Sequence, residues 1–275
     1  MHRSRLVLLL ALLAVALVFV ARRGALEKLE SSAFHPRKLG ARTPATVGLA
    51  FEDVRFQSGG RELRGFYVAP PEGPRRAAVL IFHGDNESIS SWVPVQTRLF
   101  DAGVGSMVFD YTGYGASPGK PTFARLHEDG LAAWSAFRAR LPPGTRACGY
   151  GLSLGSGVLL EDAPSLTPPP DCLVVYGAFT SILEAGVRLH RLPRWLSLLL
   201  PDALVSLDNV ARAPAPLLVE HGDADEKFPV EDARALAARA PHATLVVVPG
   251  HNHAQPVVAP DAAAWDPVVK FVRGE

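Results

Sequence analysis

One serine in this chain lies in a pattern that gives a hydroxyl group unusual reactivity. Residues 151–155 read Gly-Leu-Ser-Leu-Gly, directly after an apolar run and before a stretch compatible with a helix. In a G-x-S-x-G turn from strand to helix the serine is exposed, and its neighbours must be small because the chain reverses tightly. An ordinary glycine-rich turn is the alternative. We predict Ser153 as a nucleophile and expect the N–H of Leu154, at the start of the helix, to donate to a developing oxyanion.

A serine of this kind needs a base, and two histidines compete for the role. His251 follows the apolar run 245–248 through Pro249 and Gly250, and His253 lies two residues further on. The run predicts a strand that ends on the same rim as Ser153. A tight Pro-Gly turn favours an inward side chain immediately after it, so we predict His251 as the general base.

An acid that orients the base is expected after the apolar run 217–220. There the sequence His-Gly-Asp-Ala-Asp offers Asp223 and Asp225. Asp223 begins the turn and can cap it, whereas Asp225 lies where the loop turns back toward the histidine. We therefore predict Asp225. The resulting order of serine, aspartate and histidine along the chain is the order of α/β-hydrolases, and it differs from that of chymotrypsin and subtilisin.

A second oxyanion donor is expected from the Phe-His-Gly-Asp-Asn loop at 82–86, which follows another apolar run. The backbone N–H of Asp85 is the predicted donor. A histidine that starts such a loop usually holds its shape by hydrogen bonding, so His83 is left out of the catalytic group.

The elements that would position these residues alternate between short apolar runs and helical stretches. Two extended segments, 50–56 and 62–68, flank Ser-Gly-Gly and predict a hairpin. After Pro70 each apolar run of four to seven residues ends in Gly, Asp or His, and this alternation with helices predicts a mostly parallel sheet of about eight strands covered on both faces. Ligands bind at the carboxyl ends of such strands, where the candidate residues lie.

Composition narrows the classes of partner. The chain of 275 residues has 28 Lys and Arg against 27 Asp and Glu, which provides no basic footprint for nucleic acid. Its 2 cysteines are too few for a four-cysteine zinc site or a disulfide scaffold. We expect a small-molecule or lipid-like acyl substrate and neither a metal nor an organic cofactor.

The N-terminus predicts a membrane segment. An unbroken apolar run from Leu6 to Ala21 is flanked by arginines, and as a helix it spans about 24 Å, slightly less than a bilayer core. Cleavage as a signal peptide is the rival interpretation. We predict an anchor over residues 1–24, a linker over 25–48 and a catalytic domain over 49–275. Basic residues on both sides of the run leave the side of the membrane open.

Together these motifs resemble the BEM46-like group of α/β-hydrolases, which includes the ABHD13 and ABHD17 types. The resemblance covers about Thr43 to Phe271 and rests on the serine turn, the 83–85 loop, the Asp-Tyr-Thr-Gly-Tyr-Gly-Ala-Ser turn at 110–117 and the Gly-His-Asn sequence at 250–252. It implies a small cap, here about 183–207, and matches Asp225 and His251 to the group's catalytic pair. Asp85 departs from the group's usual His-Gly-Asn, and a carboxylate there would weaken an oxyanion site unless it points away.

The resemblance implies hydrolysis of an ester or thioester through an acyl-serine intermediate, since the group's relatives include esterases and protein depalmitoylases. A catalytically silent, membrane-tethered binding protein of the same fold is the alternative, because fold alone does not determine function.

Overall fold

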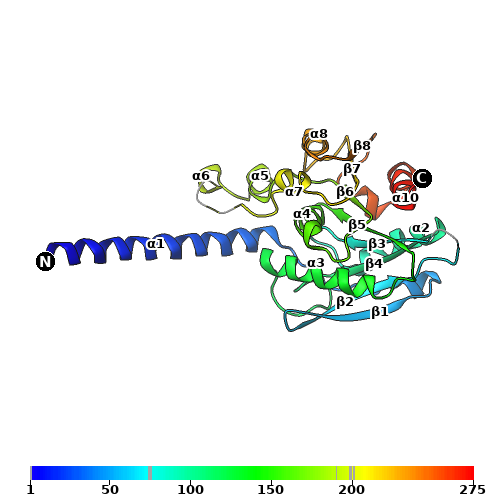
Figure 1. The fold of residues 1–275 in the computed structure, drawn as a ribbon, viewed down its shortest axis with the longest axis horizontal. Coiled ribbons are helices and arrows are strands. Elements are labelled where there is room, and N and C mark those ends of the chain that lie inside the picture. Colours follow the sequence, from blue (N-terminus) through cyan, green and yellow to red (C-terminus); the bar gives the residue numbers. More distant parts are fainter. Residues whose placement is uncertain (1, 74–75, 190, 198–199, 201) are drawn as a thin grey trace.

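An eight-stranded sheet forms the centre of the protein (Figure 1), with the strand order β1-β2-β4-β3-β5-β6-β7-β8. The computed structural model describes residues 2–73, 76–189, 191–197, 200 and 202–275, without the side chains of 2–11, 14–19 and 196. The strands are β1 (Glu52–Ser58), β2 (Arg61–Val68), β3 (Ala77–Phe82), β4 (Val104–Asp110), β5 (Arg146–Leu152), β6 (Cys172–Tyr176), β7 (Leu217–Gly222) and β8 (Ala243–Val248). Only β2 pairs in the antiparallel sense, with β1 and with β4. The predicted mostly parallel sheet is therefore confirmed.

Helices cover both faces of the sheet because its central strands are apolar on both sides. In β3, Leu80 and Phe82 face one buried cluster and Val79 and Ile81 face the other. The first cluster includes residues of α3 (Phe123–Arg138), α4 (Leu154–Asp162), α7 (Ser206–Val210) and α8 (Val230–Arg239). The second includes residues of α2 (Val93–Asp101), α9 (Gln255–Val258) and α10 (Ala262–Arg273). The described residues also form three short 3-10 helices: η1 (Pro44–Val47), η2 (Ile89–Trp92) and η3 (Ala163–Ser165).

The predicted cap region holds two short helices, α5 (Ile182–Arg188) and α6 (Arg194–Ser197), before α7. Ser181 caps α5 by accepting a hydrogen bond from the N–H of Glu184. Parts of this region, at 190, 198–199 and 201, lie outside the described residues.

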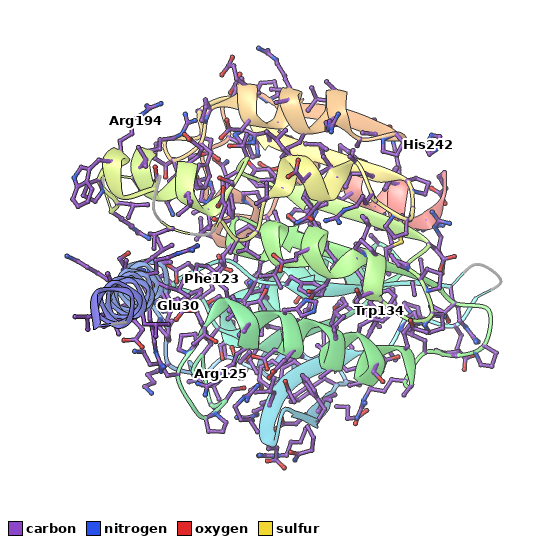
Figure 2. All side chains as sticks on the ribbon, turned by 60° about the vertical axis from the view of Figure 1, so that its left-hand side comes forward. Glu30, Phe123, Arg125, Trp134, Arg194 and His242 are labelled. Atoms are coloured by element: carbon purple, nitrogen blue, oxygen red, sulfur yellow. A yellow bond between two sulfur atoms is a disulfide. The ribbon has the colours of Figure 1, made fainter. Side chains whose placement is uncertain are left out.

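Helix α1 (His2–Ala33) projects away from the domain in Figure 1. Residues 25–33, predicted as linker, continue this helix, because good helix formers such as Glu27, Lys28 and Leu29 precede the first proline at position 36. Its last turns are attached to the domain. Leu29 is buried, and the Glu30 Oε1 atom accepts a hydrogen bond of 3.0 Å from the N–H of Phe123 (Figure 2).

Most side chains of the apolar run at 6–21 lie outside the described residues. Among the residues that were described, no helix combines the length and apolar character needed to cross a membrane.

A disulfide joins Cys148 of β5 to Cys172 of β6. These residues are directly opposite each other in the parallel pair, both buried, with their Cα atoms 4.7 Å apart. The bond links the strand that leads into Ser153 to its neighbour.

Candidate active site

Ser153 occupies a strained turn between β5 and α4. Its backbone angles are φ 54° and ψ −116°, a positive φ that non-glycine residues rarely adopt. The flanking glycines allow the turn: a Cβ on Gly155 would collide with the carbonyl oxygen of Phe82, and one on Gly151 would lie 2.6 Å from that of Gly155. The spacing of the G-x-S-x-G pattern is thus explained by close backbone approach.

The turn is held by hydrogen bonds to the ends of β5 and β6. The N–H of Ser153 donates to the Tyr176 carbonyl at 2.9 Å, and the Ser156 hydroxyl donates to the Gly151 carbonyl at 2.8 Å. The Ser156 hydroxyl therefore stabilises the turn. The Ser153 side chain is left facing two cavities, which it helps to line.

Asp225 lies in the loop after β7 and contacts His253. Its Oδ1 atom accepts N–H bonds from Lys227 at 2.8 Å and Phe228 at 3.0 Å, which leaves Oδ2 free to lie 2.7 Å from His253 Nδ1. Burial raises the pKa of Asp225, but the hydrogen bonds from His253 and from the loop outweigh it, so the pKa is lowered overall. An ionised Asp225 fixes the histidine proton on Nδ1.

The other ring nitrogen of His253 is available for chemistry. His253 is buried, and within the described part of the chain its Nε2 atom has no hydrogen-bond partner. His253 and Ser153 line the same cavity of about 460 Å³. With Nδ1 protonated toward Asp225, Nε2 carries the lone pair that a general base requires.

His251 is placed elsewhere, and its predicted pairing with Asp225 is wrong. Its Nδ1 lies 3.1 Å from the Pro249 carbonyl, and its Nε2 lies 3.0 Å from Asp261 Oδ2, in the residue that caps α10. His251 does not contribute to the lining of either cavity that contains Ser153.

The reason is how the loop after β8 crosses the end of β7. The N–H of Gly250 donates to Asp223 and the N–H of Ala224 donates to the His251 carbonyl. These hydrogen bonds place His251 beside Asp223 and Ala224, at the start of the loop after β7. The histidine that contacts Asp225 is therefore the one two residues later, His253. The Pro-Gly turn therefore does not direct the next side chain inward.

The two residues predicted to supply the oxyanion donors line the same cavity as Ser153. Leu154 is the first residue of α4, and Asp85 follows β3; both line a cavity with Ser153. In the described residues neither backbone N–H has a protein acceptor. This arrangement provides two free donors of the kind that stabilise a tetrahedral oxyanion.

The Asp85 carboxylate is held by groups away from the serine. Its Oδ1 atom accepts from the N–H of His35 at 2.6 Å and from the Tyr114 hydroxyl at 2.9 Å, while Oδ2 lies 2.7 Å from His35 Nδ1. The Asp85 carboxylate, which replaces the asparagine usual in the resembling group, is therefore bound by the segment after α1. This contact was not predicted from the sequence.

Two more groups shape the same loop. His83 is buried with its Nδ1 atom 2.7 Å from the Gly84 carbonyl, and burial lowers its pKa to about 4, as suits the structural role predicted for it. Glu87 accepts the Gly84 N–H at 2.9 Å and the Trp92 Nε1–H at 2.8 Å. Desolvation raises the pKa of Glu87 to about 7.

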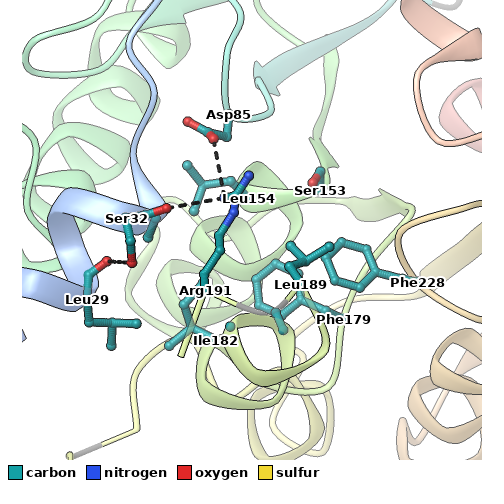
Figure 3. Close-up of a pocket in the computed structure, with 13 residues that line it drawn as sticks. Leu29, Ser32, Asp85, Ser153, Leu154, Phe179, Ile182, Leu189, Arg191 and Phe228 are labelled. Carbon is teal, nitrogen blue, oxygen red and sulfur yellow. Dashed lines mark hydrogen bonds and ion pairs between the residues drawn. The ribbon is translucent and has the colours of Figure 1, made fainter. Parts of the chain in front are cut away.

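A narrow apolar crevice opens beside Ser153 (Figure 3). Its volume is about 60 Å³, and its walls come from the end of α1, from α5 and its flanks, and from two phenylalanines. The apolar lining residues include Leu29, Leu154, Phe179, Ile182, Leu189 and Phe228. The serine hydroxyl thus lies between a crevice for apolar groups and the larger cavity that contains His253.

Residues 73–215, more than half of the chain, match the Hydrolase_4 family model, described as serine aminopeptidase, S33. The chain belongs to this family. It is an α/β-hydrolase, and its resemblance to the ABHD17 type is confirmed by sequence similarity over part of the chain. Human alpha/beta hydrolase domain-containing protein 17C is 30% identical over 190 residues, which cover 64% of this chain and 53% of that protein. The uncharacterized protein Rv2307c of Mycobacterium tuberculosis is 33% identical over 218 residues, covering 78% of this chain and 75% of its own.

Solved structures share the fold of this α/β-hydrolase. The esterase Pf2001 of Pyrococcus furiosus superposes with a TM-score of 0.70 at 21% identity, over 88% of this chain and 98% of that one. Est1E from Butyrivibrio proteoclasticus, with ferulic acid bound, gives a TM-score of 0.62 at 20% identity, over 80% and 96%.

Proposed function

We propose that this α/β-hydrolase is a serine esterase or thioesterase in which Ser153 attacks the acyl carbon, His253 is the general base and Asp225 orients it. The observation that carries the proposal is the Asp225–His253 contact of 2.7 Å beside a cavity shared with Ser153. No observation favours the alternative of a catalytically silent binding protein, because serine, histidine and aspartate all lie at one site.

The proposed reaction has two steps, acylation of Ser153 and hydrolysis of the acyl-serine. His253 Nε2 takes the proton of Ser153 as Oγ bonds to the acyl carbon, and the oxyanion is stabilised by the N–H groups of Asp85 and Leu154. The bond to the alcohol or thiol then breaks, and His253 returns the proton to that leaving group. His253 then takes a proton from water as the water oxygen bonds to the acyl carbon, and it gives that proton to Ser153 Oγ as the acyl–oxygen bond breaks and the carboxylic acid leaves.

The apolar crevice supports an acyl group as the part of the substrate next to Ser153. Phe179 and Phe228 form one wall, and Leu29 of α1 contributes another. A volume of about 60 Å³ accommodates a short acyl segment near the carbonyl, so a longer chain must extend past α1 and α5.

The test is labelling by a fluorophosphonate probe, followed by hydrolysis of p-nitrophenyl esters of increasing chain length. Ser153→Ala should lose labelling and turnover while keeping its circular dichroism and melting temperature, because only the nucleophile is removed. Ser165→Ala, exposed beyond the far end of α4, is the matched control and should behave as the parent. Equal labelling of Ser153→Ala would overturn the proposal.

We also propose that residues 1–24 anchor the enzyme in a membrane. The support is the sequence itself, an apolar run of 16 residues between arginines, together with a helical backbone throughout the segment from position 2. Carbonate extraction of cell membranes should leave the full chain in the pellet. Release of the intact full chain into the supernatant would contradict the anchor.

A further inference from the structure

The larger cavity at Ser153 continues into a second one along the segment that follows α1. The first, of about 460 Å³, contains Ser153 and His253, and the second has a volume of about 390 Å³. Arg37, Ser91, Val257 and Val258 line both, so the two form one trough that leads away from the serine.

Among the described residues, five cationic side chains line this trough. Arg37, Arg191 and Lys227 belong to the first cavity, and Arg37, Lys38 and Arg42 belong to the second. The described residues that line the second cavity include no aspartate or glutamate. We call the two joined cavities, with these five side chains, the cationic trough.

Among the described residues that line the first cavity, three cations outnumber two carboxylates, and both carboxylates are held by other groups. Asp85 is paired with His35 at 2.7 Å and also bound by Tyr114, and Glu87 is turned into its own loop, where it accepts two hydrogen bonds. Arg191 lies 4.0 Å from Asp85 and donates to the Ser32 carbonyl (Figure 3). Within the described chain, neither Arg37 nor Lys227 has a carboxylate within 4.0 Å, so their charge is available to a ligand.

The backbone that carries the cations is fixed at several points. The Arg37 carbonyl accepts the N–H of Gly115 at 2.8 Å, and Lys38 forms a bridge with the same residue. Further along, the Gly40 carbonyl accepts the hydroxyl of Ser90 at 2.9 Å. The segment after α1 is thus part of the wall of the trough, because the body of the domain holds it in place.

We propose that the cationic trough is a subsite for an anionic group, a carboxylate or phosphate, on the alcohol or thiol part of the substrate. The inference rests on the proposed function, because it assigns the acyl part to the apolar crevice and the leaving group to the other side of Ser153. Charges that line a cleft raise the local concentration of an opposite charge and lower the dissociation constant of its bearer. The anion takes no part in bond making, so the proton balance of the reaction is unchanged.

The test compares two esters with the same acyl chain and the same nitrophenol core: 3-octanoyloxy-4-nitrobenzoate, which is anionic, and its neutral methyl ester. For the full-length enzyme at low ionic strength, kcat/KM should favour the anionic ester by at least about fivefold, and about 0.5 M NaCl should remove most of that preference. The double variant Arg37→Gln/Lys227→Gln should lose the preference, mainly through a higher KM for the anionic ester. Arg239→Gln, an exposed cation at the end of α8, is the control and should keep it.

The outcomes separate this inference from the proposed function. If the enzyme hydrolyses neither ester, the proposed function fails. If it hydrolyses both with equal kcat/KM, or if the double variant keeps the preference, the subsite is overturned. Sedimentation with vesicles of phosphatidylcholine and phosphatidylglycerol, at about three to one, tests a membrane role for the same cations. Reduced vesicle binding by the double variant with an unchanged ester preference would also overturn the subsite.

Discussion

The Asp225 Oδ2 atom lies 2.7 Å from His253 Nδ1, and His251, two residues earlier, contacts Asp261 instead. The loop after β8 thus carries two histidine–aspartate pairs with different surroundings. The pair with His253 lies at the cavity of Ser153, while the pair with His251 ties the loop to the N-terminus of α10. The proposed mechanism therefore uses the first pair.

Replacement of each histidine by alanine should separate these roles. His253→Ala removes the base and should lower kcat by at least about a thousandfold. His251→Ala leaves the base in place and should lower kcat far less, with a loss of thermal stability from the lost contacts to Pro249 and Asp261. Rates of fluorophosphonate labelling and melting temperatures measure both effects. Retained labelling in His253→Ala together with its loss in His251→Ala would reverse the assignment.

The two aspartates of the loop after β7 provide a second matched pair. Asp225→Asn keeps the shape of the side chain but no longer stabilises the protonated imidazole, so kcat should fall by about a thousand- to ten-thousandfold with little change in KM. Asp223 accepts the Gly250 N–H at 2.6 Å, a bond that asparagine can still accept. Asp223→Asn should therefore cost about 1 kcal/mol of stability or less and keep most of its activity. Steady-state kinetics and urea unfolding distinguish the two, and equal losses of kcat would contradict this division of roles between the aspartates.

The sequence predicts the fold well because the information is local. Apolar runs such as 77–82 alternate with amphipathic helices. A strand that is apolar on both faces is expected in the middle of a sheet that helices cover on both sides. The elbow at Ser153 is equally local, since Gly151 and Gly155 are required by contacts within the turn and with the adjacent β3 end. The position of Asp225 also follows from its own loop, where it accepts the N–H bonds of Lys227 and Phe228.

The choice between the two histidines could not be predicted from local sequence. Whether His251 or His253 reaches Asp225 depends on how the loops after β7 and β8 pair, through Gly250 with Asp223 and Ala224 with His251. The partners of Asp85 are equally hidden, because His35 lies 50 residues earlier in the chain and Tyr114 comes from a different loop. Such contacts have no periodicity or motif that marks them.

The disulfide between β5 and β6 gives a prediction about stability. Protein isolated without reductant and then unfolded should show no free thiol to an alkylating reagent, since both cysteines are bonded. The double variant Cys148→Ala/Cys172→Ala should lose about 2–4 kcal/mol of unfolding free energy, because the bond closes a loop with a sequence separation of 24. Mass spectrometry after alkylation and urea unfolding measure these effects. Alkylation of both cysteines in the unreduced protein would show that the bond is absent.

Glu87, in the loop after β3, makes the stability of the protein depend on pH. Its carboxylate accepts the Gly84 N–H and the Trp92 Nε1–H, and desolvation raises its pKa to about 7 from the ordinary value of 4.5. A raised pKa means that the folded state holds the proton more tightly than the unfolded state. The stabilisation is complete below the unfolded pKa of about 4.5 and is lost as the pH rises through about 7.

Glu87→Gln should therefore become more stable relative to the parent as the pH rises. Glutamine can accept the same two hydrogen bonds and carries no charge, so its unfolding free energy relative to the parent should increase by about 2–3 kcal/mol between about pH 4 and pH 8. Glu72→Gln, an exposed site between β2 and β3, should show no such trend. Urea unfolding of the three proteins across this range measures the difference. A constant difference between Glu87→Gln and the parent would show that the Glu87 carboxylate does not titrate there, because any folded-state pKa near 7 must change their relative stability as the proton is lost.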